Sequence, residues 1–193
     1  PVTNAFASDI IDVQLSSFYK ANSYNKLPSM VSTITSTFRL PQTASYYLGL
    51  GNNLNTVHLD AESLATTAGY NLNNYNIIIV AFSSFPLSWW GMAEVGGKRQ
   101  WLNGVFDFSI TAHETGHNLG AKHANFWDTN GQSINGIGVN QEYGNDFDIM
   151  GYSDEYLGGS KRHMSAALKN QLNYLLDSDI YSVTTSGDYQ IVA

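Results

Sequence analysis

The residues best suited to chemistry form one short segment, His-Glu-Thr-Gly-His at 113–117, followed by His123. On a helix, His113 and His117 lie four residues apart and project from the same face, so both imidazoles can reach one metal ion. A catalytic zinc ion takes three protein ligands and keeps a fourth position open. His123 can supply the third ligand, because Gly120 can adopt a positive φ, end the helix and turn the chain back. The segment therefore predicts a three-histidine zinc site.

Glu114 follows the first of these histidines and is not needed as a ligand. Its carboxylate can lie over the open metal position and hold a water molecule. A zinc-bound water has its pKa lowered from about 15.7 towards roughly 7, and a neighbouring carboxylate can take its proton as the water attacks a carbonyl carbon. A single histidine on a helix is usually a surface or core residue, but five fixed residues at these spacings arise by chance in fewer than about one in ten thousand such chains. The predicted reaction is the cleavage of an amide.

This extended motif resembles the metzincin clan of zinc endopeptidases, which place a methionine-containing turn beneath the metal. The segment Asp-Ile-Met-Gly-Tyr at 148–152 fits that turn. The resemblance implies that Met150 forms an apolar floor under the three imidazoles. It also implies that Tyr152 stabilises the oxyanion, because astacin-like and serralysin-like branches carry a tyrosine at the same offset. An ordinary packed tyrosine is the alternative.

Shorter segments are similar to the gametolysin family and its bacterial relatives. They are Val95–Gly97, Trp101–Gly104, His117–Gly120, His123-Ala124, Glu142–Gly144, Asn22–Tyr24 and Ser186–Tyr189. The resemblance implies a metzincin-like zincin fold: a twisted, mostly parallel sheet with an active-site helix and an irregular C-terminal subdomain. Residues 1–193 would form one metalloprotease domain, divided near residue 120 into an upper and a lower subdomain.

Metzincins also have an edge strand, just before the strand that leads into the active-site helix, to which the extended substrate binds. Such binding uses main-chain hydrogen bonds to an exposed sheet edge. Core packing of the tryptophans in this region is the alternative. The resemblance implies that the substrate contacts are Trp90, Gly91, Met92 and Ala93.

The elements that must position these residues are predicted from hydrophobic periodicity and cap residues. Helices are predicted at 9–20 (with Ser8 or Asp9 as the N-cap), 58–70, 107–119 and 162–176. Strands are predicted at 29–40, at 75–83 as a central strand, in a hairpin over 91–103 and in the tail at 181–192, with 124–143 irregular. Because helices and strands mix without strict alternation, the predicted class is α+β.

Composition narrows the classes of function. The chain has 193 residues, no cysteine and a formal net charge of -7. One compact domain is expected, and disulfides and thiol nucleophiles are excluded. The negative charge disfavours nucleic acid as a partner, and no apolar run approaches the roughly 20 residues that cross a bilayer. We expect a monomer.

Other titratable residues have less specific patterns. His58 and His163 have no partner at ligand spacing, which predicts surface or helix-capping roles. Four acidic residues near the methionine turn could bind calcium, but their spacing matches no standard calcium loop and solvated loop charges are favoured. They are Asp146, Asp148, Asp154 and Glu155.

The motif and the resemblance together predict a secreted, extracellular zinc endopeptidase that hydrolyses internal bonds of protein or peptide substrates. The N-terminus, Pro1–Asn4, has neither a basic stretch nor an apolar segment, so any signal or pro-segment is expected to have been removed. Two alternatives remain: a catalytically silent metzincin-fold binding or adhesion module, and a zinc hydrolase acting on a non-protein amide. Glu114 argues against the silent module, which would have no use for a base at that position.

Overall fold

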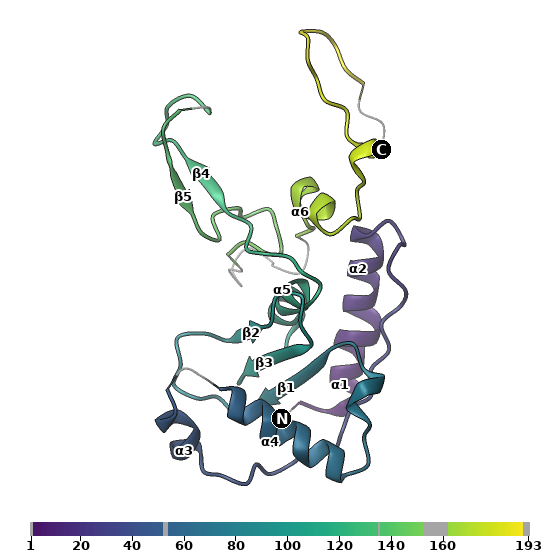
Figure 1. Ribbon diagram of the computed structural model, residues 1–193, viewed down its shortest axis with the longest axis vertical. Helices are drawn as coiled ribbons and strands as arrows, with labels where there is room; N and C mark the ends of the chain where they lie inside the picture. The colour runs from purple at the N-terminus through teal and green to yellow at the C-terminus, as the bar shows by residue number, and fades with distance from the viewer. Residues whose placement is uncertain (1, 52–53, 135, 153–161, 191–193) are drawn as a thin grey trace.

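Short helices and short strands follow one another without regular alternation (Figure 1). The computed structural model describes residues 2–51, 54–134, 136–152 and 162–190. The mixture of helices and strands without regular alternation confirms the α+β class. The helices are α1 (Asn4–Ser8), the π-helical η1 (Asp9–Leu15), α2 (Ser16–Asn22), α3 (Ala44–Gly49), α4 (Asn55–Thr67), η2 (Leu72–Asn74), α5 (Phe108–Asn118), α6 (Ala166–Gln171) and η5 (Asp177–Asp179). The strands are β1 (Ile78–Phe82), β2 (Gly91–Ala93), β3 (Arg99–Asn103), β4 (Phe126–Asp128) and β5 (Val139–Gln141).

The main sheet has the strand order β1-β3-β2 within the described part of the chain. β1 pairs with β3 in parallel, whereas β2 and β3 form the predicted antiparallel hairpin. The expectation of a mostly parallel sheet is therefore wrong, since the sheet is small and mixed. The apolar run at 75–83 does form a strand, but as an edge strand with half-buried side chains rather than as a central one, because β3 inserts between β1 and β2.

The helix that carries the first two histidines packs on this sheet through buried polar contacts. Asp107 caps α5 by accepting a hydrogen bond from the Ile110 N–H at 2.8 Å. The buried Gln100 side chain, on β3, donates to the Thr111 carbonyl at 3.4 Å and accepts from the Thr115 hydroxyl at 3.3 Å. The predicted helix over 107–119 is confirmed, and these bonds fix its rotation against β3.

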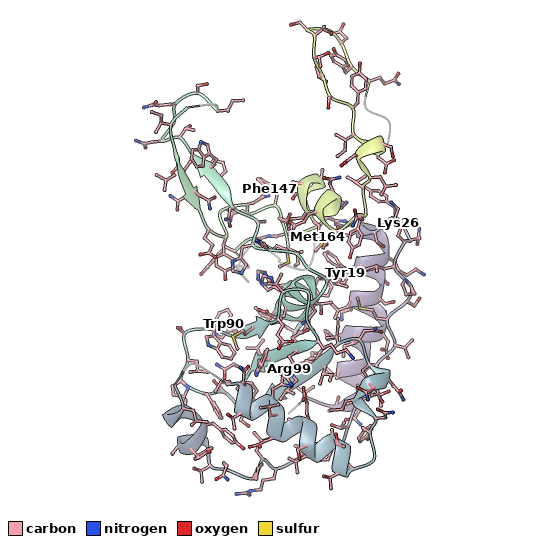
Figure 2. All side chains as sticks on the ribbon, viewed as in Figure 1. Tyr19, Lys26, Trp90, Arg99, Phe147 and Met164 are labelled. Atoms are coloured by element: carbon pink, nitrogen blue, oxygen red, sulfur yellow. The ribbon has the colours of Figure 1, made fainter. Side chains whose placement is uncertain are left out.

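The N-terminal helices pack beside α5 (Figure 1). The helical segment begins five residues before the predicted one, because Thr3 and not Ser8 or Asp9 is the cap: its hydroxyl accepts from the Phe6 N–H at 3.2 Å. Tyr19 projects from α2 toward α5 (Figure 2), and its hydroxyl donates to the Ala112 carbonyl at 2.5 Å. The predicted first helix is thus confirmed and forms one wall of the core.

Residues 29–40 form no strand, contrary to the prediction. Their backbone groups instead bond to side chains of the N-terminal helices: the Met30 N–H donates to Ser16 Oγ at 3.0 Å, and the Ser32 N–H to Asp12 Oδ1 at 2.6 Å. The segment is therefore held in an irregular course along these helices. Its β-branched residues favour a strand, but the segment pairs with none of the described strands.

The C-terminal third also differs from the prediction. A β4–β5 hairpin extends from the body within the stretch predicted to be irregular (Figure 1). The helix predicted over 162–176 is reduced to α6, which Ser165 caps. The tail shows no strand over 181–190. None of the helices in the described ranges is both long and apolar enough to span a membrane.

His58 is fully buried, so the predicted surface or capping role is wrong. Its Nδ1 lies 3.0 Å from Glu62 Oε1 and its Nε2 lies 3.1 Å from the Ile78 carbonyl oxygen, which joins α4 to β1. Burial lowers the pKa of this imidazole. His163 is exposed, as predicted.

Candidate metal centre

Three histidines converge where α5 ends. His113 and His117 lie on one face of the helix, and the chain turns back at Gly120, which has a φ of 107°. The turn is closed by hydrogen bonds from the Gly120 N–H to the His117 carbonyl at 2.8 Å and from the Ala121 N–H to the helix. One ligand atom each from His113, His117 and His123 lies within 4.8 Å of the others. The structure therefore brings together the three ligands that the motif predicts.

Each of these imidazoles has a fixed orientation, because its Nδ1 faces a hydrogen-bond acceptor. A carbonyl or carboxylate oxygen can only accept, so Nδ1 carries the hydrogen and the Nε2 lone pair is free. This is the tautomer that binds a metal through Nε2. The acceptors are the Ile149 carbonyl at 2.9 Å from His113, the Ala121 carbonyl at 2.8 Å from His117, and Glu142 Oε1 at 2.7 Å from His123.

Burial keeps the two helix-borne imidazoles neutral. It lowers the pKa of His113 to about 4, with a smaller contribution from the adjacent His117, and it lowers the pKa of His117 as well. Neutral imidazoles are the form that binds metal. Without a metal, the unfolded chain takes up protons on these histidines near pH 6.5 and the folded chain only at lower pH. Acidification below about 6.5 therefore destabilises the metal-free fold.

The methionine turn lies directly under the helix. Met150 is fully buried, and its Sδ packs so closely against Gly116 that a side chain there would overlap it. Asp148, also fully buried, holds the turn: Oδ1 accepts from the Met150 N–H at 2.9 Å and Oδ2 from the Ser165 N–H at 2.6 Å. An apolar thioether thus packs against the helix next to His117.

These contacts bear on the calcium prediction. Both carboxylate oxygens of Asp148 are occupied by backbone N–H groups, which makes this residue part of the turn rather than of an ion site. Asp146 is exposed, whereas Asp154 and Glu155 lie outside the described residues. Among the residues that the structure describes, the only group of three or more histidine or acidic side chains arranged to hold a metal ion is the three-histidine group.

The Glu114 side chain is buried beside this group, with only 6% of its surface exposed. Its carboxylate lies against Gly91 of β2, and within the described part of the chain Oε2 has no hydrogen-bond partner. Burial raises the pKa of this carboxyl to about 8. A divalent cation nearby would favour the ionised form. A buried carboxylate oxygen with no partner, next to three free Nε2 atoms, fits a metal ion with a water molecule.

The β2 strand forms the open edge of the sheet next to Glu114. Bonded and non-bonded residues alternate along an antiparallel pair, so the main-chain groups of Gly91 and Ala93 point away from β3. The flanking bonds that define this alternation are Asn103 N–H to the Trp90 carbonyl at 2.7 Å and Glu94 N–H to the Arg99 carbonyl at 3.0 Å.

The predicted substrate contacts therefore divide into two groups. Gly91, Met92 and Ala93 form the edge strand itself, and the Trp90 side chain is 54% exposed beside it (Figure 2). The neighbouring Trp89 instead packs against the apolar cluster of Tyr47, Leu54, Val57 and Trp101. Core packing thus accounts for one tryptophan and leaves the other exposed at the edge.

A tyrosine other than the predicted one contacts the histidines. The Tyr143 ring centroid lies 3.7 Å from that of His123 and 5.9 Å from that of His113. Tyr152 is 63% exposed, and its N–H donates to the Tyr143 carbonyl at 2.8 Å. An oxyanion role for Tyr152 stays a prediction. Tyr143 belongs to the Glu-Tyr-Gly segment that the resemblance includes, but no spacing rule connects it to the ligands.

Asn118 is a second residue that the sequence did not single out. Its Nδ2 is shared by three carbonyl oxygens of the β2–β3 turn, so it ties the hairpin to the end of α5. A helix-terminal asparagine is common enough that its type alone carried no signal. The acceptors are Arg99 at 2.9 Å, Gly97 at 3.0 Å and Glu94 at 3.3 Å.

No protein-family model, curated protein or solved structure matches this chain. The function of the site has to be inferred from its own residues. Those residues are a three-histidine group that can hold a metal ion and, beside it, a buried glutamate at the edge of a small sheet.

Proposed function

We propose that this chain is a secreted zinc endopeptidase of the metzincin type, similar to the gametolysin family, acting on extracellular protein or peptide substrates. One observation carries the proposal. Glu114, the residue next to His113, buries a carboxylate whose Oε2 has no hydrogen-bond partner among the described residues, while ligand atoms of three imidazoles lie within 4.8 Å of one another. A site that only stored or transported a metal would gain nothing from burying this carboxylate.

The donor set favours zinc. Three imidazoles and an open fourth position are the usual surroundings of catalytic zinc, and the group contains no thiolate or carboxylate. When bound, zinc supplies a Lewis acid that acidifies water and polarises a carbonyl. The protein contributes the fixed ring orientations and the apolar floor of Met150.

Glu114 is the proton carrier of the proposed reaction. Its free oxygen accepts a proton from the attacking water as the water oxygen bonds to the carbonyl carbon. The carboxyl then delivers that proton to the amide nitrogen as the C–N bond breaks. The buried surroundings raise its pKa towards 8, so the protonated form that follows the first step is well tolerated there.

The β2 edge is the proposed binding strip for the substrate. Its outward main-chain groups at Gly91 and Ala93 can pair with an extended peptide, as an added strand does. Because Gly91 contacts the Glu114 carboxylate, a peptide paired there passes directly beside the base. Binding through main-chain groups suits a protease that accepts many sequences, with selectivity left to the surrounding side chains.

The Gly91→Ala variant tests this geometry. The added methyl group would lie 2.5 Å from Glu114 Oε1, so the carboxylate must move. Since a shift of about 1 Å can cost 10²-fold in rate, we expect kcat to fall by about 10- to 100-fold with zinc affinity unchanged. Gly49→Ala is the control, because its methyl group meets nothing within 4 Å. Wild-type kcat in the Gly91→Ala variant would show that the base does not lie against β2.

The proposal as a whole is tested with casein and gelatin as substrates. We expect cleavage by the purified protein, loss of cleavage with a chelator, and recovery when zinc is added back. Cleavage that continues unchanged in the chelator would overturn the zinc mechanism. Stoichiometric zinc binding without cleavage of either substrate would favour a binding module, and turnover of only small non-protein amides would favour the hydrolase alternative.

A further inference from the structure

The third histidine is held differently from the other two. His113 and His117 bond to main-chain carbonyls, whereas His123 Nδ1 lies 2.7 Å from a side-chain carboxylate oxygen of Glu142. The His123 side chain is 23% exposed and that of Glu142 is 65% exposed. The least buried ligand is therefore oriented by the one acceptor that carries a full charge.

The β4–β5 hairpin brings these two residues together. His123 lies three residues before β4, and Glu142 directly follows β5; continuing the register beyond the Phe126–Gln141 pair puts Glu142 opposite Asn125, two residues from His123. A further bond, from the Tyr143 N–H to Asn125 Oδ1 at 3.1 Å, continues this contact beyond the ladder. The hairpin thus brings together His123 and Glu142, which are 19 positions apart in the sequence.

Tyr143, the residue after Glu142, also contacts the His123 imidazole. The Tyr143 ring packs on the His123 imidazole with 3.7 Å between centroids and the ring planes tilted by 34°, while Glu142 bonds the edge of the same imidazole. Tyr143 has a φ of 61°, in the left-handed region, which turns its side chain onto the imidazole immediately after Glu142. One edge and one face of His123 are thus fixed by two consecutive residues.

We propose that Glu142 is the positioning residue for the third metal ligand, and that it holds His123 in the Nδ1–H tautomer that points Nε2 toward the ion. This inference rests on the metal site proposed above. A carboxylate behind a ligating imidazole raises the basicity of that ligand, and loss of such a partner usually weakens metal binding by 10- to 100-fold. Glu142 does not touch the ion or the substrate; it acts through His123.

Zinc affinity provides the first test, measured by competition with a chromophoric chelator. We expect Glu142→Ala to weaken binding by about 10- to 100-fold. Glu142→Gln should lose less, because its amide oxygen can still accept from Nδ1. Asn140→Ala, an exposed change on the same hairpin, is the matched control and should bind as wild type. Because Glu142 is largely exposed, the metal-free variants should unfold at the wild-type temperature.

Nitrogen-15 NMR of the metal-free protein gives a readout independent of activity. We expect His123 to be in the Nδ1–H tautomer in wild type and to shift toward the Nε2–H form in Glu142→Ala. Wild-type zinc affinity in Glu142→Ala, or an Nε2–H tautomer in the wild-type protein, would overturn the inference. A locked tautomer and weakened zinc binding in a protein that cleaves no substrate would instead overturn the proposed function and leave the positioning role intact.

Discussion

Replacing Glu114 by glutamine is expected to lower the rate of peptide cleavage by about 10²- to 10⁴-fold while zinc remains bound. Glutamine has the same shape but cannot take a proton from water. The change removes no protein hydrogen bond from Oε2, which has no partner in the described part of the chain. The three ligands are untouched. The measurement is kcat/KM on a fluorogenic peptide, with zinc content determined on the same sample.

Stability separates this chemical effect from a folding defect. Burial raises the pKa of Glu114, so in the metal-free protein the ionised carboxylate opposes folding above pH 8, and this cost disappears below about pH 4.5. The metal-free glutamine variant should therefore be at least as stable as wild type at pH 8. Asp146→Asn makes the same chemical change at an exposed carboxylate and should keep full activity. More than a tenth of wild-type activity in Glu114→Gln would exclude Glu114 as the base.

The convergence of the three histidines could be predicted from sequence because helix geometry relates spacing to direction. His113, Glu114 and His117 fall on known faces of one helix, and Gly120 marks where that helix must end. The structure brings His113, His117 and His123 together as the spacing requires. No tertiary information was needed for this local part of the site.

Residues held by long-range contacts could not be predicted in the same way. Glu142 is 19 residues from His123 and meets it only through a hairpin whose strands are three residues long. At 29–40 the β-branched residues predicted a strand, but the structure has no strand there. Contacts with Ser16 and Asp12 on the N-terminal helices decided its course instead. Tertiary partners, which local propensity does not encode, determined both outcomes.

His58 illustrates a third limit. The absence of a partner at ligand spacing predicted a surface or capping role, but the His58 imidazole contacts the Ile78 carbonyl of β1 and is buried. The same residue type therefore has two settings in this chain: three histidines form a group that could hold a metal ion, and a fourth uses both ring nitrogens within the fold. A ring nitrogen without a protein partner, rather than burial, distinguishes the ligand from the core residue.

Zinc is expected to raise the melting temperature of the wild-type protein and to leave that of His117→Ala nearly unchanged. Binding only to the folded state stabilises it by about 2.7 kcal/mol when free zinc is 100 times the dissociation constant. For a domain of this size each kcal/mol shifts the melting temperature by about 2–4 °C, which gives a rise of about 5–11 °C. Without His117, only one helix-borne ligand and His123 remain, so the same zinc concentration should add less than about 1 °C.

His163→Ala is the matched control for this measurement, because it removes an exposed histidine outside the three-histidine group. It should keep the full zinc-dependent rise, which separates binding at the site from adventitious binding to surface imidazoles. A full rise in His117→Ala would mean that the ion binds elsewhere. Equal loss in both variants would point to surface binding, since the His163 side chain is not among the three ligand groups that converge. A rise that depends on His117 and not on His163 is the outcome that three convergent imidazoles on one helix and its following turn require.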